Sequence, residues 1–190
     1  MNLIIGTAQF GLDYGVANQD GLISLDEGKK ILDYSVESGI DTIDTAVLYG
    51  KSEINLGIIG VDKLKVITKI PKLPNFDVDI FKWVQDTVKS SLERLNINKL
   101  HAVLLHKPDD LLGPSGKEIY SGLLDLKNSG IITKIGISSY SIDEIRRVLD
   151  SFTLDIIQTP LNLIDRSLLA SNIIDDLKKK DIEIHIRSVF

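Results

Sequence analysis

The chain has 190 residues, of which 43% are hydrophobic, so it can bury one substantial core and is expected to form a single domain over residues 1–190. Its 22 basic and 27 acidic residues give a net charge of −5 without a basic stripe, and it has no cysteine, so neither nucleic-acid binding nor cysteine chemistry is expected. No segment resembles a signal peptide or approaches the roughly 20 apolar residues of a membrane span, so we expect a cytoplasmic protein without a membrane partner.

Strand and helix signals alternate through the first half of the chain. A Ser-x-x-Glu capping box at Ser24 begins a helix, and Gly39 is placed to end it. The longest predicted helix, over residues 79–95, has an apolar stripe that is typical of core packing. The other elements predicted in this half are strands over residues 3–7, up to Asp44 and over 64–70, and a short helix over 52–59.

The second half repeats this alternation without a linker or a shift in composition. A capping box at Ser141 begins one of its helices. The other elements predicted here are strands ending at His106 and covering residues 131–138, 154–159 and 182–190, and helices over 116–128 and 165–180.

Seven strands with intervening helices, at roughly the 30-residue pitch of a βαβ unit, predict a parallel α/β sheet. A doubly wound dinucleotide fold should carry Gly-x-Gly-x-x-Gly after its first strand, and no such motif follows Ile5. Polar residues instead stand near the carboxyl ends of several strands, as they do in a TIM-type (β/α) barrel. We therefore predict a barrel, with Asp44, Lys69, His106, Ser138 and Gln158 at its active end.

Three short motifs close successive strands: Asp44-Thr-Ala-Val-Leu-Tyr49-Gly50, Thr68-Lys69 and Leu104-Leu-His106. In this order they resemble the aldo-keto reductase family. The segments Gly6-Thr-Ala-Gln-Phe-Gly11 and Gly136-Ile-Ser-Ser139 are similar to the first and fifth strands of that family, and the resemblance covers essentially the whole chain. It implies a reductase that converts a small-molecule aldehyde or ketone to an alcohol with NADPH, NADH being the other cofactor that it allows.

The chemistry of carbonyl reduction fits four of these residues, which are also the catalytic set that the resemblance implies. Tyr49 would give a proton to the carbonyl oxygen, and Lys69 would bring the phenol pKa of about 10 closer to neutral pH. Asp44 would hold the lysine in its charged form, and a neutral His106 would aim the carbonyl oxygen. Taken singly, Asp44 could be a turn former, Lys69 a solvated cation and His106 the start of a loop.

Cofactor contacts are implied by the resemblance alone. The nicotinamide amide would be held by Ser138, Ser139 and Gln158, although Ser139 stands where the family usually has an asparagine and has a shorter reach. Arg187 and Ser188 fall where the family places residues beside the nicotinamide ring. The full cofactor set implied is Gly6, Thr7, Asp44, Ser138, Ser139, Gln158, Arg187 and Ser188. No metal is expected, because no His-x-His pair or carboxylate cluster is present.

Compared with the family pattern, the sequence stops at Phe190, after the seventh strand, so we expect a barrel without its eighth βα unit. The chain would then be a fragment of a longer reductase or a natural short form, with weak cofactor binding and self-association through the unpaired edges of its first and seventh strands. Two functions stay open. The intact catalytic set favours an NADPH-dependent carbonyl reductase, and the missing unit favours a catalytically silent barrel that serves as a binding or assembly module.

Overall fold

One parallel sheet organises the chain in the computed structural model, which describes residues 3–16, 18–74 and 77–189. Its strands follow the order β1-β2-β3-β4-β5-β6-β7, so each strand pairs with its neighbours in sequence. They are β1 (Ile5–Gly6), β2 (Thr42–Asp44), β3 (Lys65–Ile70), β4 (Leu100–Leu105), β5 (Ile132–Ser138), β6 (Ile156–Pro160) and β7 (Glu183–Arg187). The helices are η1 (Ala8–Phe10), α1 (Leu25–Glu37), α2 (Ser52–Ile59), α3 (Ile80–Leu95), α4 (Asp109–Leu112), α5 (Gly116–Asn128), α6 (Ile142–Leu149), α7 (Ser167–Ala170) and α8 (Ile173–Lys179).

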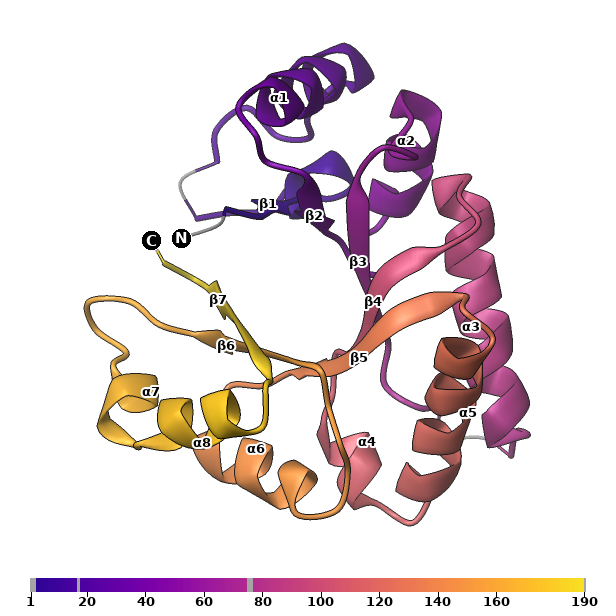
Figure 1. The fold of residues 1–190 in the computed structure, drawn as a ribbon. Helices are drawn as coiled ribbons and strands as arrows, with labels where there is room; N and C mark the ends of the chain where they lie inside the picture. Colours follow the sequence, from indigo (N-terminus) through magenta and orange to yellow (C-terminus); the bar gives the residue numbers. More distant parts are fainter. Residues whose placement is uncertain (1–2, 17, 75–76, 190) are drawn as a thin grey trace.

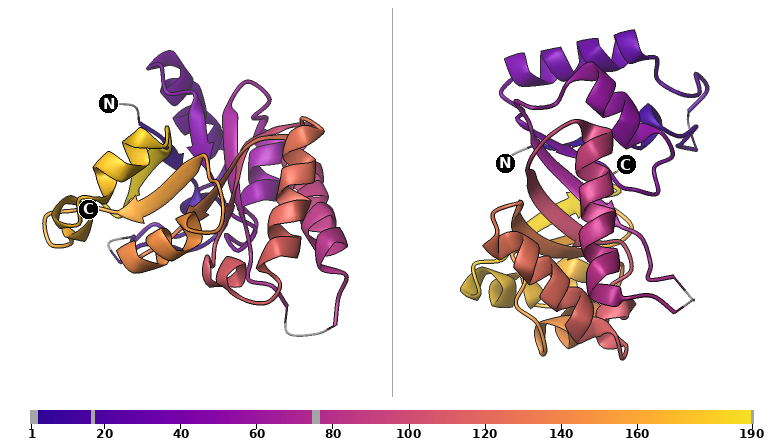
Figure 2. Two further views of the ribbon diagram at one scale, coloured as in Figure 1. Left: turned by 60° about the horizontal axis from the view of Figure 1, so that its bottom comes forward. Right: turned by 90° about the vertical axis from the view of Figure 1, so that its right-hand side faces the viewer.

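The sheet curls into an open ring with its helices on the outside, and β1 and β7 are its two edge strands (Figure 1). Parallel strands need crossover connections, and here the helices that make them cover the outer face of the sheet. Helices α3 and α5 lie side by side in that layer, where Gln85 Nε2 donates to the carbonyl oxygen of Gly122 at 3.0 Å (Figure 2). The predicted incomplete (β/α) barrel of seven strands is thus confirmed.

Capping residues set the starts of the main helices. Ser24 Oγ accepts from the backbone N–H of Glu27 at the start of α1, and Ser141 Oγ accepts from that of Glu144 at the start of α6. Gly39 ends the first helical segment in the left-handed region, with φ at 79°. Ser24 and Ser141 are therefore confirmed as helix caps, and the bounds predicted for α2 and α5 are confirmed as well.

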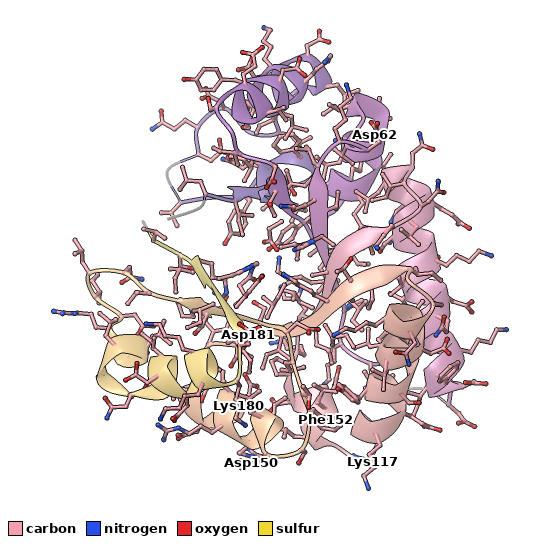
Figure 3. All side chains as sticks on the ribbon, viewed as in Figure 1. Asp62, Lys117, Asp150, Phe152, Lys180 and Asp181 are labelled. Carbon is pink, nitrogen blue, oxygen red and sulfur yellow. The ribbon has the colours of Figure 1, made fainter. Side chains whose placement is uncertain are left out.

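Apolar side chains fill both faces of the sheet. The main core lies between the strands and the outer helices, with Ile43, Val88 and Ile137 among its buried members. A second, smaller cluster lies on the inner face of the ring and consists of Ile67, Ala102, Leu104 and Ile156, with Ile4 packed against it. Figure 3 shows side chains projecting into the ring as well as outward.

Within the described ranges, no helix has the length and apolarity needed to span a bilayer.

The structure departs from the predicted elements mainly near the carboxyl terminus. The single helix predicted over residues 165–180 is wrong, because Asn172 takes a left-handed conformation, with φ at 56°, and separates α7 from α8. The strand predicted over residues 182–190 ends at Arg187, since Ser188 also has a positive φ. The short helices η1 and α4 follow β1 and β4 and were not predicted.

Candidate active site

Asp44 ends β2, at the end of the ring where the carboxyl ends of the strands lie. Its two carboxylate oxygens have different partners. Its Oδ2 lies 2.6 Å from Lys69 Nζ, and its Oδ1 accepts from Gln158 Nε2 at 3.2 Å. Successive side chains of a strand point to opposite faces, so Asp44 faces the inside of the ring while Ile43 packs in the outer core. A carboxylate held at both oxygens has a fixed orientation toward the lysine.

Lys69 projects from β3 and is 1% exposed. Its ammonium donates to Asp44 Oδ2, to the carbonyl oxygen of Thr45 at 3.0 Å and to the Tyr49 hydroxyl at 3.4 Å. Three acceptors match the three N–H bonds of a charged lysine. Burial lowers the pKa of Lys69, and the negative charge of Asp44 opposes that change.

Tyr49 stands in the turn that follows β2, where its backbone N–H donates to the carbonyl oxygen of Ala46 at 3.0 Å. Because the phenol oxygen accepts from Lys69, its own O–H stays free to donate elsewhere. Burial and the charge of Asp44 raise the pKa of Tyr49 above its ordinary value. This differs from the expectation that Lys69 brings the pKa toward neutral pH. The main reason is that burial disfavours the phenolate, and the negative charge of Asp44 adds to this effect, so the phenol stays protonated.

His106 follows β4, where its backbone N–H donates to the carbonyl oxygen of Ile70 at 3.1 Å. Its ring lies edge-on to that of Tyr49, with centroids 6.0 Å apart and an interplanar angle of 83°. Burial, together with the charge of Lys69, lowers the pKa of His106 to about 4, so the imidazole is neutral at pH 7. Its Nδ1 is buried and has no hydrogen-bond partner among the described residues. An orphaned buried N–H is costlier than an orphaned acceptor, which favours the tautomer with the proton on Nε2.

A second polar cluster lies beside Asp44 on the strands of the other half of the ring. Ser138 Oγ, at the end of β5, donates to Gln158 Oε1 at 2.9 Å and accepts from Arg187 Nε at 3.3 Å. The Arg187 guanidinium also donates to the carbonyl oxygen of Ser139 at 3.3 Å and stacks 3.6 Å from the ring centroid of Tyr140. The guanidinium plane of Arg187 is thus held between these hydrogen bonds and the ring of Tyr140.

Four other residues are predicted to contact the cofactor, namely Gly6, Thr7, Ser139 and Ser188, and the structure gives each of them contacts within the protein. Thr7 is buried and its hydroxyl donates to the backbone carbonyl oxygen of Asp44 at 3.0 Å, so it supports the strand that carries the site. Gly6 pairs with Asp44 in the sheet, and the space where a Cβ would stand is open. Ser139 Oγ accepts from the backbone N–H of Ser141 at 3.1 Å and contacts Glu144, so this side chain is directed to α6. Ser188 accepts through its backbone carbonyl oxygen from Asn162 Nδ2 at 2.9 Å.

Tyr140 was missed in the sequence and is the main addition to the site. It directly follows Ser138 and Ser139 at the carboxyl end of a strand, and that position is the signal that could have identified it. Its ring is 76% exposed and carries the stacked Arg187. In the part of the chain that the structure describes, no three histidine, aspartate or glutamate side chains gather as a metal site would require.

Comparison with solved structures places the same fold in known enzymes. A Pseudomonas aeruginosa protein assigned to the aldo-keto reductases superposes with a TM-score of 0.80 at 27% identity, over 96% of this chain and 71% of the other. A glycerol dehydrogenase from Gluconobacter oxydans superposes with a TM-score of 0.73 at 26% identity, over 96% of this chain and 58% of the other.

Curated sequences give the same result over shorter spans. The chain is 32% identical over 122 residues to D-arabinose 1-dehydrogenase of Saccharomyces cerevisiae, covering 60% of this chain and 36% of that protein. It is 26% identical over 130 residues to 2,5-diketo-D-gluconic acid reductase B of a Corynebacterium species, covering 66% and 45% respectively. The chain spans about half the length, or less, of these curated relatives. The model of the aldo/keto reductase family matches residues 2–190, and the chain belongs to that family.

Proposed function

We propose that this chain is an NADPH-dependent oxidoreductase, with NADH as a second cofactor it allows, that reduces an aldehyde or ketone to an alcohol with Tyr49 as proton donor. The observation that carries the proposal is the position of Lys69, whose Nζ lies 2.6 Å from Asp44 Oδ2 and 3.4 Å from the Tyr49 hydroxyl. A buried ammonium beside a protonated phenol is suited to charge that develops on that phenol. Membership of the family supports the same reaction class.

Each of the four side chains has a role in the transfer of one proton to the substrate. The Tyr49 hydroxyl gives its proton to the carbonyl oxygen, and the Lys69 ammonium stabilises the phenolate that remains. Asp44 keeps that ammonium in place at the end of β3. His106, neutral at pH 7, donates from Nε2 to the same carbonyl oxygen and orients the substrate. The nicotinamide cofactor, when bound, supplies the hydride.

The second polar cluster fits the carboxamide of a nicotinamide. Ser138 and Gln158 are buried polar residues, with exposed fractions of 5% and 4%. They lie beside Asp44, at the end of the ring where the carboxyl ends of the strands lie. Gln158 retains one N–H and one oxygen lone pair beyond the bonds described, which suits an amide with one donor group and one acceptor. Arg187 Nε donates to the same Ser138 hydroxyl that donates to Gln158. Ser139 contributes less in this proposal, because its hydroxyl is occupied at α6.

Replacement of Tyr49 by phenylalanine tests the proposal, because it removes the donated proton and keeps the ring packed against His106. Oxidation of NADPH in the presence of a panel of aldehydes and ketones is followed for the wild-type chain and for Tyr49→Phe. We expect turnover to fall by about 100-fold or more, the usual contribution of a positioned general acid. Wild-type turnover in Tyr49→Phe would refute the assigned donor, and inactivity of the wild type with every carbonyl would refute the function.

The second candidate function is a catalytically silent barrel that serves as a binding or assembly module. The observation that favours it is the pair of edge strands, β1 and β7, each of which pairs on one side only within the described residues. An unpaired parallel edge presents backbone donors and acceptors to another chain. A chain of this kind would bind a partner in the absence of any reductase activity.

A further inference from the structure

A continuous series of hydrogen bonds crosses the ring from β7 to β3. Arg187 Nε donates to Ser138 Oγ, which donates to Gln158 Oε1. Gln158 Nε2 then donates to Asp44 Oδ1, and Asp44 Oδ2 accepts from Lys69. The series therefore joins the polar cluster suited to a carboxamide with the pair that supports the proton donor. Within this series, Gln158 is the side chain that joins the cluster to the Asp44–Lys69 pair.

We infer that Gln158 is a positioning residue for the Asp44–Lys69 pair, in addition to the cofactor contact proposed for it. This role rests on the proposed function, since it acts through the residues assigned to proton transfer. Without the amide donor, Asp44 could rotate about its side chain and turn Oδ2 away from Lys69. With it, one oxygen is held by Gln158 and the other stays toward the ammonium, which in turn contacts the Tyr49 hydroxyl.

The geometry of Gln158 explains how it can serve both partners. The Asp44 carboxylate can only accept, so the amide nitrogen of Gln158 must face it. The amide oxygen then accepts from the Ser138 hydroxyl at 2.9 Å. The second N–H and the second lone pair remain for a carboxamide. Contact with the cofactor and contact with Asp44 are thus compatible.

The substitution Gln158→Glu separates these two roles, because it keeps the shape of the side chain and replaces the donating nitrogen by oxygen. A carboxyl beside Asp44 has a raised pKa, since two like charges repel. Below that pKa the introduced carboxyl is protonated and can donate to Asp44 Oδ1; above it the donor is lost and a second negative charge is added. Asp44 is bonded to this position directly, Lys69 through Asp44 and Arg187 through Ser138, and His185 is its partner on β7 in the sheet.

We expect Gln158→Glu to introduce a new ionisation into the pH profile of kcat. Relative to the wild type, kcat should fall by about tenfold as pH rises from 5 to 8, which is the effect of losing one hydrogen bond to a charged group. Gln158→Leu, which cannot donate at any pH, should lower kcat by a similar factor throughout. If Gln158 contacts only the cofactor, both variants will raise the KM for NADPH and leave the pH profile of kcat unchanged, and the inference is then wrong.

A measurement on the cofactor-free chain keeps the inference separate from the proposed function. The Lys69 ammonium, held by three acceptors, should give a slowly exchanging nitrogen-15 signal, identified by its loss in Lys69→Met. In Gln158→Leu we expect this signal to exchange faster with solvent, by about tenfold, while far-UV circular dichroism stays unchanged. A protected signal in both Gln158 variants would overturn the positioning role. If the wild type shows no turnover but the signal responds as expected, the function fails and the positioning role stands.

Discussion

His106 ties the protonation of the site to the stability of the chain. Burial and the charge of Lys69 lower its pKa to about 4, below the ordinary value of about 6.5 for an unfolded histidine. Between these two values the unfolded chain binds a proton that the folded chain does not. The stability that His106 contributes is therefore fully present above pH 6.5, and it is lost as pH falls toward 4.

We expect the free energy of unfolding in urea to fall by about 1–2 kcal/mol between pH 7 and pH 4.5 through this group, after allowance for its partial exposure. His106→Gln removes the titration and should flatten that part of the pH dependence. His101→Gln is the comparison variant, because burial also lowers the pKa of His101 and its removal should flatten the pH dependence through a separate position. An unchanged slope in His106→Gln would show that the imidazole does not resist protonation.

The four proposed catalytic residues could be predicted from sequence because each one closes or directly follows a strand, and the carboxyl ends of parallel strands meet at one end of a barrel. The direction of the Tyr49 pKa could not be predicted in this way. It depends first on how deeply the phenol is buried and then on how near the Asp44 charge lies, and both require the folded structure. The bond between Gln158 and Asp44 joins residues 114 positions apart, so no local pattern announces it.

Ser139 is predicted to contact the cofactor, and in the structure its side chain contacts the start of α6. Ser139 Oγ accepts from the backbone N–H of Ser141 and contacts Glu144 in the first turn of that helix. We expect Ser139→Ala to lower the free energy of unfolding by about 1 kcal/mol, because the side chain's hydrogen bonds to Ser141 and Glu144 are lost. Affinity for NADPH, measured by fluorescence titration, should change by less than about twofold, because the side chain is already engaged.

Ser138→Ala is the matched variant for that test, because Ser138 donates to Gln158 in the proposed carboxamide cluster. It should weaken NADPH binding more than Ser139→Ala does. The reverse order would show that Ser139 leaves α6 to contact the cofactor, as the family pattern implies.

Helix and strand bounds followed the sequence closely wherever a capping residue or a glycine marks them. The bounds of α2 and α5 were predicted to the residue. The segment between β6 and β7 was not, because Asn172 and Ser188 adopt left-handed conformations that no glycine signals. Asparagine tolerates this region better than most residues, so the break between α7 and α8 is physically reasonable once it is seen.

At the scale of the whole molecule, the two edge strands predict association of the chain. Within the described residues, β1 and β7 each pair on one side only. We expect the 190-residue chain to sediment as a dimer or larger species at about 50 µM, a concentration at which exposed edges can pair.

A proline on β7 provides the control for edge pairing. The backbone N–H of Glu183 donates to the carbonyl oxygen of Asp155, so the alternate residues Ile184 and Ile186 direct their N–H groups to the open side. Ile186→Pro removes a donor from that side without breaking the contact with β6, as an edge strand tolerates. It should shift sedimentation toward the monomer. A wild-type chain that is already monomeric at this concentration would contradict the prediction.

The residues of the site also fall into two sets along the chain, according to the role proposed for each. Asp44, Tyr49, Lys69 and His106 come from the consecutive units β2, β3 and β4, whereas Ser138, Gln158 and Arg187 come from β5, β6 and β7. Proton transfer is thus proposed for residues 44 to 106, and the carboxamide contacts for residues 138 to 187. The bond from Gln158 Nε2 to Asp44 Oδ1 joins the two sets, so recombination at a point after α5 would require that the incoming segment restore the donor to Asp44.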